Sequence, residues 1–131
     1  MPSPWPSHRH WSVLVLQVFS SDNGGPAFSD QHAASNYPKR GGKYSSFEGG
    51  INVASFVSGG VLPAERRGKT DSGIVHVADW YSTFCYLAGV DPTDSHPGVP
   101  DIDSLNQWPV ITGTATSPVR TEVFTVTDAL I

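Results

Sequence analysis

The pattern of hydrophobic and polar positions divides the chain into short apolar segments separated by long polar stretches. Residues 12–19 carry a nearly continuous apolar run, SVLVLQVF, which is typical of a strand covered on both faces in a parallel sheet. A second apolar run at 51–57, INVASFV, predicts another strand. A last extended segment is expected over 122–126.

Helical spacing is clearest at 77–88, where apolar residues recur every three or four positions. Asp79 stands near the start of this segment as a capping residue, and Gly89 follows it as a stop. A short second helix is expected within 104–112, broken by Pro109. Because strands and helices are interleaved, the sequence predicts an α/β fold rather than a β-sandwich.

The composition shows that much of the chain lies in loops. The 131 residues include 13 glycines and 11 prolines, a share well above the roughly 12% of ordinary domains. Many of them fall in residues 20–50, a loop long enough to predict a functional role. Three prolines and no periodicity predict a disordered leader at 1–11, which leaves 12–131 as the folded portion.

Charge and apolar length exclude some classes of partner. The net charge of −4 argues against binding to nucleic acid or to anionic lipid. The apolar run at 13–19 is far shorter than the roughly 20 residues that span a bilayer, and no signal-peptide cleavage pattern follows it. Local positive charge suited to a small anion is limited to Lys39, Arg40, Lys43, Arg66, Arg67 and Lys69.

A candidate metal site follows the first predicted strand. Asp22 offers a carboxylate and Asn23 an amide oxygen, both of which suit a hard cation such as Ca²⁺ or Mg²⁺. Gly24 and Gly25 allow a sharp turn, and ligands of α/β proteins gather at the carboxyl ends of strands. The alternative is an ordinary turn, because Asp-Asn-Gly-Gly is also a common turn sequence.

A glycine-rich basic segment at 36–43 supplies a candidate anion contact. Lys43 is the best single candidate to neutralise an anionic substrate facing the metal. Arg40 is expected to brace the loop by pairing with Glu48 or Asp30. The alternative is a solvated basic loop with no ligand.

Five ordered blocks carry a family resemblance: VFSSDNGG, NYPKRGGK, FEGGINVASFV, HVADWYSTFCYLAGVD and DIDSLNQWPVITG. In this order and spacing they resemble the later part of the sulfatase catalytic domain, most closely the arylsulfatase B (N-acetylgalactosamine-4-sulfatase) type. The resemblance implies part of the alkaline-phosphatase-like α/β fold, with a mixed sheet, flanking helices and long loops. It also implies hydrolysis of sulfate esters of glycans or aryl sulfates, a bound Ca²⁺, a formylglycine nucleophile, and a lysosomal or secreted location.

The resemblance also assigns roles to individual residues. Asp22 and Asn23 match the later pair of Ca²⁺ ligands, and Lys43 matches the lysine that contacts substrate sulfate. Structural roles are expected for the turn Glu48-Gly49-Gly50, for Asp79-Trp80 at the helix start, and for His76 as a capping or packing histidine.

Departures from the family pattern limit what the chain can do alone. Sulfatases carry C/S-x-P-x-R, whose first residue becomes the nucleophile, and this sequence contains none. Cys85 is followed by Tyr-Leu-Ala-Gly and is expected to be a buried, inert thiol, so no catalytic residue is assigned. The family's early Asp-Asp metal pair is also missing, Asn52 replaces a common arginine, and Ser82 replaces a proline.

Three hypotheses follow. The leading one is a C-terminal piece of a sulfatase domain, inactive alone, that carries half of a Ca²⁺ and sulfate site. The second is a non-enzymatic module that binds Ca²⁺ or an anion. The third is a phosphatase or phosphodiesterase of the same superfamily, but these enzymes need additional His and Asp ligands for zinc, and the five histidines do not show that spacing.

Overall fold

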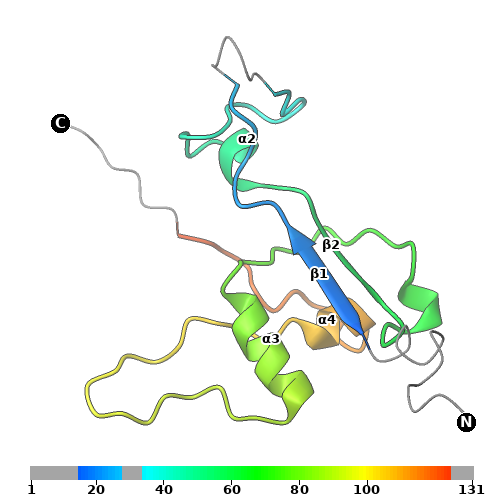
Figure 1. The fold of residues 1–131 in the computed structure, drawn as a ribbon, viewed down its shortest axis with the longest axis vertical. Helices are drawn as coiled ribbons and strands as arrows, with labels where there is room; N and C mark the ends of the chain where they lie inside the picture. Colours follow the sequence, from blue (N-terminus) through cyan, green and yellow to red (C-terminus); the bar gives the residue numbers. More distant parts are fainter. Residues whose placement is uncertain (1–14, 28–33, 125–131) are drawn as a thin grey trace, which may run out of the picture. The chain divides into compact units, whose positions relative to one another are not determined.

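The computed structural model describes residues 15–27 and 34–124 (Figure 1). The predicted leader at 1–11 and the first residues of the strand expected at 12–19 lie outside the described residues. Contacts divide the described chain into two compact units, the first ending at Val61 and the second running from Leu62 to Phe124.

The first unit is built on a two-stranded antiparallel sheet. Strand β1, Leu16–Ser20, pairs with β2, Ser55–Gly59, with Val18 opposite Val57 at the centre. The prediction of a parallel sheet covered on both faces is therefore wrong. Side chains alternate along β1, with Leu16 and Val18 half-buried and the residues between them exposed. On the exposed face Phe19 stacks on Phe56 with ring centroids 5.2 Å apart, an arrangement that stabilises a cross-strand pair.

Residues 21–54 connect the two strands, and their described part, 21–27 and 34–54, contains one helical turn, α2, Glu48–Ile51. The sequence predicted a turn at 48–50 and a strand beginning at 51. The strand instead begins at Ser55, because the backbone amides of Ile51 and Asn52 bond back to Phe47 and Glu48 and close the helical turn. The buried residues of α2 are Gly49 and Gly50, which allows neighbouring backbone to approach the helix closely.

The second unit holds a short 3₁₀ turn, η1, Ala64–Arg66, and two helices, α3, Asp79–Ala88, and α4, Trp108–Thr112. The helix predicted at 77–88 is confirmed. It ends at Gly89, whose positive φ of 68° closes the last turn as predicted. Pro109 does not break α4 but lies in its first turn, where the missing N–H costs no helical hydrogen bond.

The buried face of α3 is polar, which reverses the expected packing. Asp79 and Thr83 are fully buried and Ser82 nearly so, whereas Tyr81 and Phe84 are about half exposed. Among the described residues the only buried hydrophobic side chain is Leu62. The second unit is therefore held together by hydrogen bonds more than by an apolar core.

The described residues form a small α and β structure in which the expected mixed sheet is not found: the sheet has two antiparallel strands. Of the extended segment expected at 122–126, the described residues 122–124 form no strand, and the rest lies outside the described residues. Within residues 15–27 and 34–124 no helix has the length and apolar character to cross a membrane.

Candidate metal and anion site

The candidate metal ligands Asp22 and Asn23 lie in the turn that directly follows β1. The Ser21 amide donates to the carbonyl of Ala54 at 3.1 Å and extends the strand pairing by one step. Within the turn, the Asn23 amide donates to Asp22 Oδ1 at 2.9 Å and Ser21 Oγ donates to the Asn23 carbonyl at 3.0 Å. The Asp22 carboxylate is exposed and Asn23 is half-buried, so oxygen donors are available to solvent.

The glycine-rich basic segment packs against this turn through backbone hydrogen bonds. The Lys43 amide donates to the Gly25 carbonyl at 3.0 Å, and the Gly24 amide donates to the Gly50 carbonyl at 2.9 Å. A Cβ at Gly24 would overlap the carbonyl oxygen of Gly49, so the backbones of the turn and of α2 meet without room for a side chain. The long connection between the strands thus folds into one cluster of loops that holds all three candidate residues.

The Asn36 side chain links these loops, a role that the sequence did not predict. Its Oδ1 accepts from the Gly25 amide at 2.8 Å, and its Nδ2 donates to the carbonyls of Gly25 at 2.8 Å and Gly41 at 3.1 Å. The position of Asn36 at the start of the basic segment was visible in the sequence. Its partners, Gly25 and Gly41, lie 11 and 5 positions away, and no local motif indicates that the Asn36 amide bonds to them.

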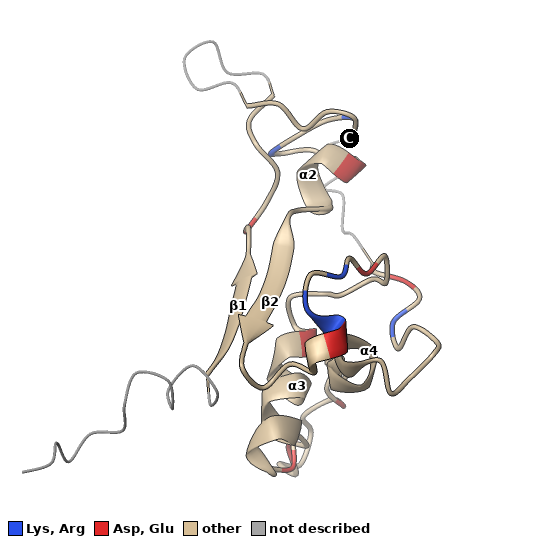
Figure 2. Cartoon of the chain, turned by 90° about the vertical axis from the view of Figure 1, so that its right-hand side faces the viewer, with Lys and Arg blue, Asp and Glu red and all other residues tan. Residues whose placement is uncertain are grey.

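The described Lys and Arg positions of the first unit, 39, 40 and 43, belong to the loop that precedes α2 (Figure 2). Lys43 Nζ lies 5.4 Å from the centroid of the Tyr44 ring. The expected pairing of Arg40 with Glu48 is wrong, because the Arg40 guanidinium lies 4.1 Å above the Phe47 ring instead. The alternative partner Asp30 lies outside the described residues.

Glu48 is occupied elsewhere. Its Oε2 accepts from Asn52 Nδ2 at 2.7 Å, and Asn52 Oδ1 in turn accepts from Lys39 Nζ at 2.8 Å. Asn52, the residue that replaces an arginine of the family pattern, therefore bridges an anion and a cation and holds the end of α2.

The oxygen donors at the turn fit a hard cation in kind but not in number. Asp22 and Asn23 together supply at most three side-chain oxygens, whereas Ca²⁺ takes six to eight. Among the described residues no three His, Cys, Asp or Glu side chains gather closely enough to hold a metal ion. No ion pair within 4.0 Å joins Asp22 to Lys43 in this part of the chain.

The second unit contains a buried ion pair between Asp79 and Arg120. Arg120 donates from Nε and from a terminal nitrogen to the Asp79 carboxylate, with its shortest contact at 2.7 Å, while Asp79 is fully buried and Arg120 is 9% exposed. The same carboxylate accepts from the amides of His76 and Leu105 and from Gln107 Nε2 at 2.8–3.0 Å. The pair thus joins three segments that are distant in sequence.

Burial and hydrogen bonding act in opposite directions on the Asp79 carboxyl. Burial by itself raises the pKa of Asp79, but hydrogen bonds from Arg120, Leu105, His76 and Gln107 together outweigh it and hold the pKa below its ordinary value. The hydrogen bond to Asp79 raises the pKa of Arg120 in turn. Both groups remain charged at neutral pH, as a structural pair and not as an acid or base.

Two further residues can be compared with their expected roles. His76 Nδ1 accepts from the Ala78 amide at 3.2 Å, which is the capping role predicted for it. The prediction that Asp79 caps the helix is wrong: Ala78 is the residue before the first turn, and Asp79, the first helical residue, accepts from the His76 amide outside the helix. Cys85 is half-buried, so the expectation of full burial is wrong.

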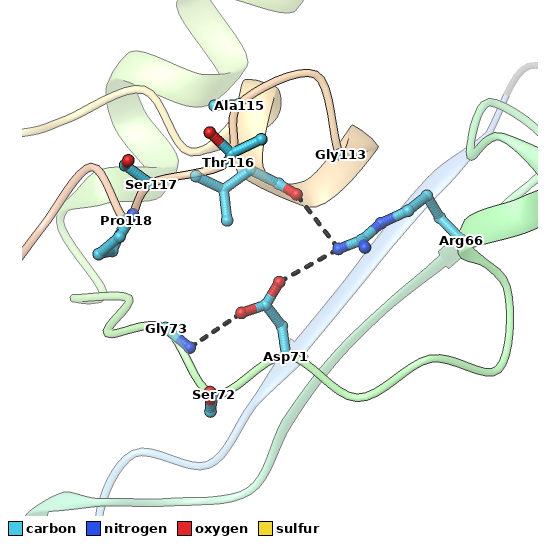
Figure 3. A pocket seen from close by; sticks show the side chains of 10 residues that line it. Arg66, Asp71, Ser72, Gly73, Gly113, Ala115, Thr116, Ser117 and Pro118 are labelled. Carbon is cyan, nitrogen blue, oxygen red and sulfur yellow. Dashed lines mark hydrogen bonds and ion pairs between the residues drawn. The ribbon is translucent and has the colours of Figure 1, made fainter.

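A cavity of about 400 Å³ lies in the second unit beside Arg66 and Asp71 (Figure 3). The Arg66 guanidinium donates to the carbonyls of Ile111 and Val110 and to Asp71 Oδ2, which lies 3.1 Å away. Since Asp71 offsets its charge, Arg66 is a weak anchor for the small anion that the basic cluster was expected to bind. None of the three candidate site residues lines this cavity.

Comparison with known proteins gives a partial relative. The chain is 39% identical to mouse (Mus musculus) arylsulfatase J over 71 residues, which is 54% of this chain. It spans 11% of the length of that relative. No family model matches the sequence. The similarity supports a relationship to the sulfatases, without specifying the arylsulfatase B type.

Proposed function

We propose that this chain is a part of a sulfatase catalytic domain and contributes one side of a Ca²⁺ and sulfate site. In this proposal Asp22 and Asn23 are ligands of the ion and Lys43 contacts the sulfate group of an aryl sulfate or a sulfated glycan. The observation that carries the proposal is the hydrogen bond between the Lys43 amide and the Gly25 carbonyl, which ties the basic segment to the turn of the two oxygen donors.

The similarity to mouse arylsulfatase J and the ordered sequence blocks support the choice of reaction. A bound Ca²⁺ would offset charge on the sulfate and orient it. Lys43 adds a charge-assisted contact to sulfate oxygens, and the loop cluster orients that contact. A lysosomal or secreted location for the complete enzyme belongs to the same proposal.

Catalysis by this chain alone is not expected, because it has no C/S-x-P-x-R sequence and only two metal-ligand side chains at the turn. Incubation with 4-nitrocatechol sulfate and Ca²⁺ tests this, and we expect no release of nitrocatechol above the buffer rate. Turnover that disappears in Asp22→Ala and persists in the control Asp101→Ala, at an exposed carboxylate of the second unit, would contradict the expectation.

The competing function is a non-enzymatic Ca²⁺-binding module. Calorimetry separates the two, because two side-chain ligands predict binding no tighter than millimolar, a range typical of weak calcium sites. Micromolar binding by the wild-type chain that is lost in Asp22→Ala would favour the module over the part of an enzyme.

A further inference from the structure

The side chain of Asn36 occupies the junction between the turn of Asp22 and the segment of Lys43. An asparagine amide offers two donor hydrogens and one acceptor oxygen. Here the oxygen takes the Gly25 amide, and the nitrogen donates to the carbonyls of Gly25 and Gly41. Gly25 belongs to the turn and Gly41 to the basic segment, so one side chain holds both.

The Gly25 carbonyl is the shared element of this junction. It accepts from Asn36 Nδ2 at 2.8 Å and from the Lys43 amide at 3.0 Å. Any displacement of the Gly25 peptide therefore moves the start of the Lys43 side chain relative to the Asp22–Asn23 turn. Asn36 contacts Gly25 at its N–H and at its C=O, which belong to the two peptide units on either side of the Gly25 Cα.

Close packing makes the junction stiff. A Cβ at Gly42 would lie 2.7 Å from Asn36 Nδ2, and a Cβ at Gly25 would lie 3.3 Å from Asn36 Oδ1. The amide therefore sits between two backbones that have no side chains of their own at these positions. Asn36 is half-buried, and its three hydrogen bonds to Gly25 and Gly41 hold the amide in this position.

We propose that Asn36 is a positioning residue that sets the separation between the Asp22–Asn23 oxygen pair and Lys43, and so couples cation binding to anion binding. This inference rests on the proposed function. A cation at the turn and a sulfate at Lys43 attract each other, and the attraction falls with distance and with freedom of the loops. Asn36 contacts neither ligand and acts only through the Gly25 peptide.

The test measures this coupling in the complete chain by amide NMR. Ca²⁺ at millimolar concentration is followed at the amides of Asp22 and Asn23, and methyl sulfate, a soluble sulfate monoester, is followed at Lys43. We expect Ca²⁺ to lower the apparent Kd of methyl sulfate by about fivefold, the low end of ordinary coupling between sites. In Asn36→Ala and Asn36→Asp we expect each ligand still to bind and the coupling to fall below about twofold.

Asn52 provides the matched controls. It lies in the same unit, and its side chain contacts Lys39 and Glu48 instead of the junction. Asn52→Ala removes an amide and Asn52→Asp adds the same charge as Asn36→Asp, and both should retain the coupling. If Asn36 only stabilised the fold, its variants would lower stability, and the coupling would weaken together with the affinities for Ca²⁺ and methyl sulfate.

Each other outcome overturns a specific statement. Coupling that survives in both Asn36 variants, or that disappears equally in Asn52→Asp, overturns the positioning role while leaving the proposed site intact. Loss of the β1 and β2 amide signals in both Asn36 variants identifies a folding residue and overturns it as well. If the wild-type turn does not respond to Ca²⁺, or Lys43 does not respond to methyl sulfate, the proposed function itself is wrong.

Discussion

The ion pair between Asp79 and Arg120 gives the sharpest test of how the second unit is stabilised. Replacing Arg120 by methionine keeps an apolar stem of similar length and removes the guanidinium. The Asp79 carboxylate, fully buried, then retains its hydrogen bonds from His76, Leu105 and Gln107 but has no counter-charge. An uncompensated buried charge is the expected result at neutral pH.

The size of the effect follows from burial. Removing one partner of a buried ion pair costs about 3–5 kcal/mol, whereas an exposed pair is worth less than about 1 kcal/mol. Folded domains have about 0.05–0.15 kcal/mol of stability per residue, so a unit of the length of Leu62–Phe124 has only about 3–9 kcal/mol in all. We therefore expect Arg120→Met to remove at least a third of this unit's free energy of unfolding.

A urea titration of the complete chain, followed by the amide signals of Thr83 and Gln107, measures the loss. Both residues are buried in the second unit, and their signals report its unfolding. Lys69→Met, at an exposed cation of the same unit, is the control and should change stability by less than about 0.5 kcal/mol. A loss below about 1 kcal/mol in Arg120→Met would refute the argument from burial.

The pH dependence provides a second criterion. The pKa of Asp79 is lower in the folded state than in the unfolded chain, where it is about 3.9. The contribution of the ion pair to folding stability is therefore complete above about pH 3.9 and is lost as the pH falls through the lower folded pKa. In Arg120→Met burial remains while the counter-charge is gone, so the pKa of Asp79 is higher than in the wild type. As the pH falls, Asp79 is protonated at a higher pH in the variant than in the wild type. The difference in unfolding free energy between wild type and Arg120→Met should therefore narrow as the pH falls from 7 toward 3. A gap independent of pH would contradict the assignment to this carboxylate.

Three further predictions concern other contacts. Gly24→Ala should disrupt the loop cluster, because its Cβ would overlap the Gly49 carbonyl, and NMR should show shifted amide signals of Gly25 and Lys43. The control Gly68→Ala, where φ is 69° but nothing lies within 4 Å, should lower the free energy of unfolding by only about 1–2 kcal/mol and leave these signals unchanged. Thr83→Val should lower the free energy of unfolding in urea by about 1–3 kcal/mol, since the buried Thr83 hydroxyl accepts from the Gln107 amide at 2.9 Å and donates to the Asp79 carbonyl. The control Thr121→Val, at an exposed position, should leave stability unchanged, and an equal loss in both variants would contradict the hydrogen-bond argument. Phe84→Gln, at a half-exposed position of α3, should lower the free energy of unfolding by less than about 1 kcal/mol in urea. A larger loss would contradict the partial exposure of this ring.

Local signals in the sequence predicted the parts of the fold that depend on neighbouring residues. The helix α3 has apolar residues at helical spacing and a terminal Gly89, and both act within the helix itself. The turn after β1 follows from Asp22 to Gly25 in the same way. The candidate residues Asp22, Asn23 and Lys43 could be named because carboxylate, amide and ammonium groups have known preferences for cations and anions.

Contacts between distant residues decided the rest. An apolar run such as 12–19 fits a strand of either direction, and only its pairing with β2 fixes an antiparallel sheet with one exposed face. The buried side of α3 could not be inferred from hydrophobicity, because Asp79 is buried by Arg120, which lies 41 positions later in the chain. The identities of the side chains are enough to name the groups that are available for chemistry. Folding decides which of them meet, since a contact such as that of Arg120 with Asp79, 41 positions earlier, forms only when distant segments are brought together.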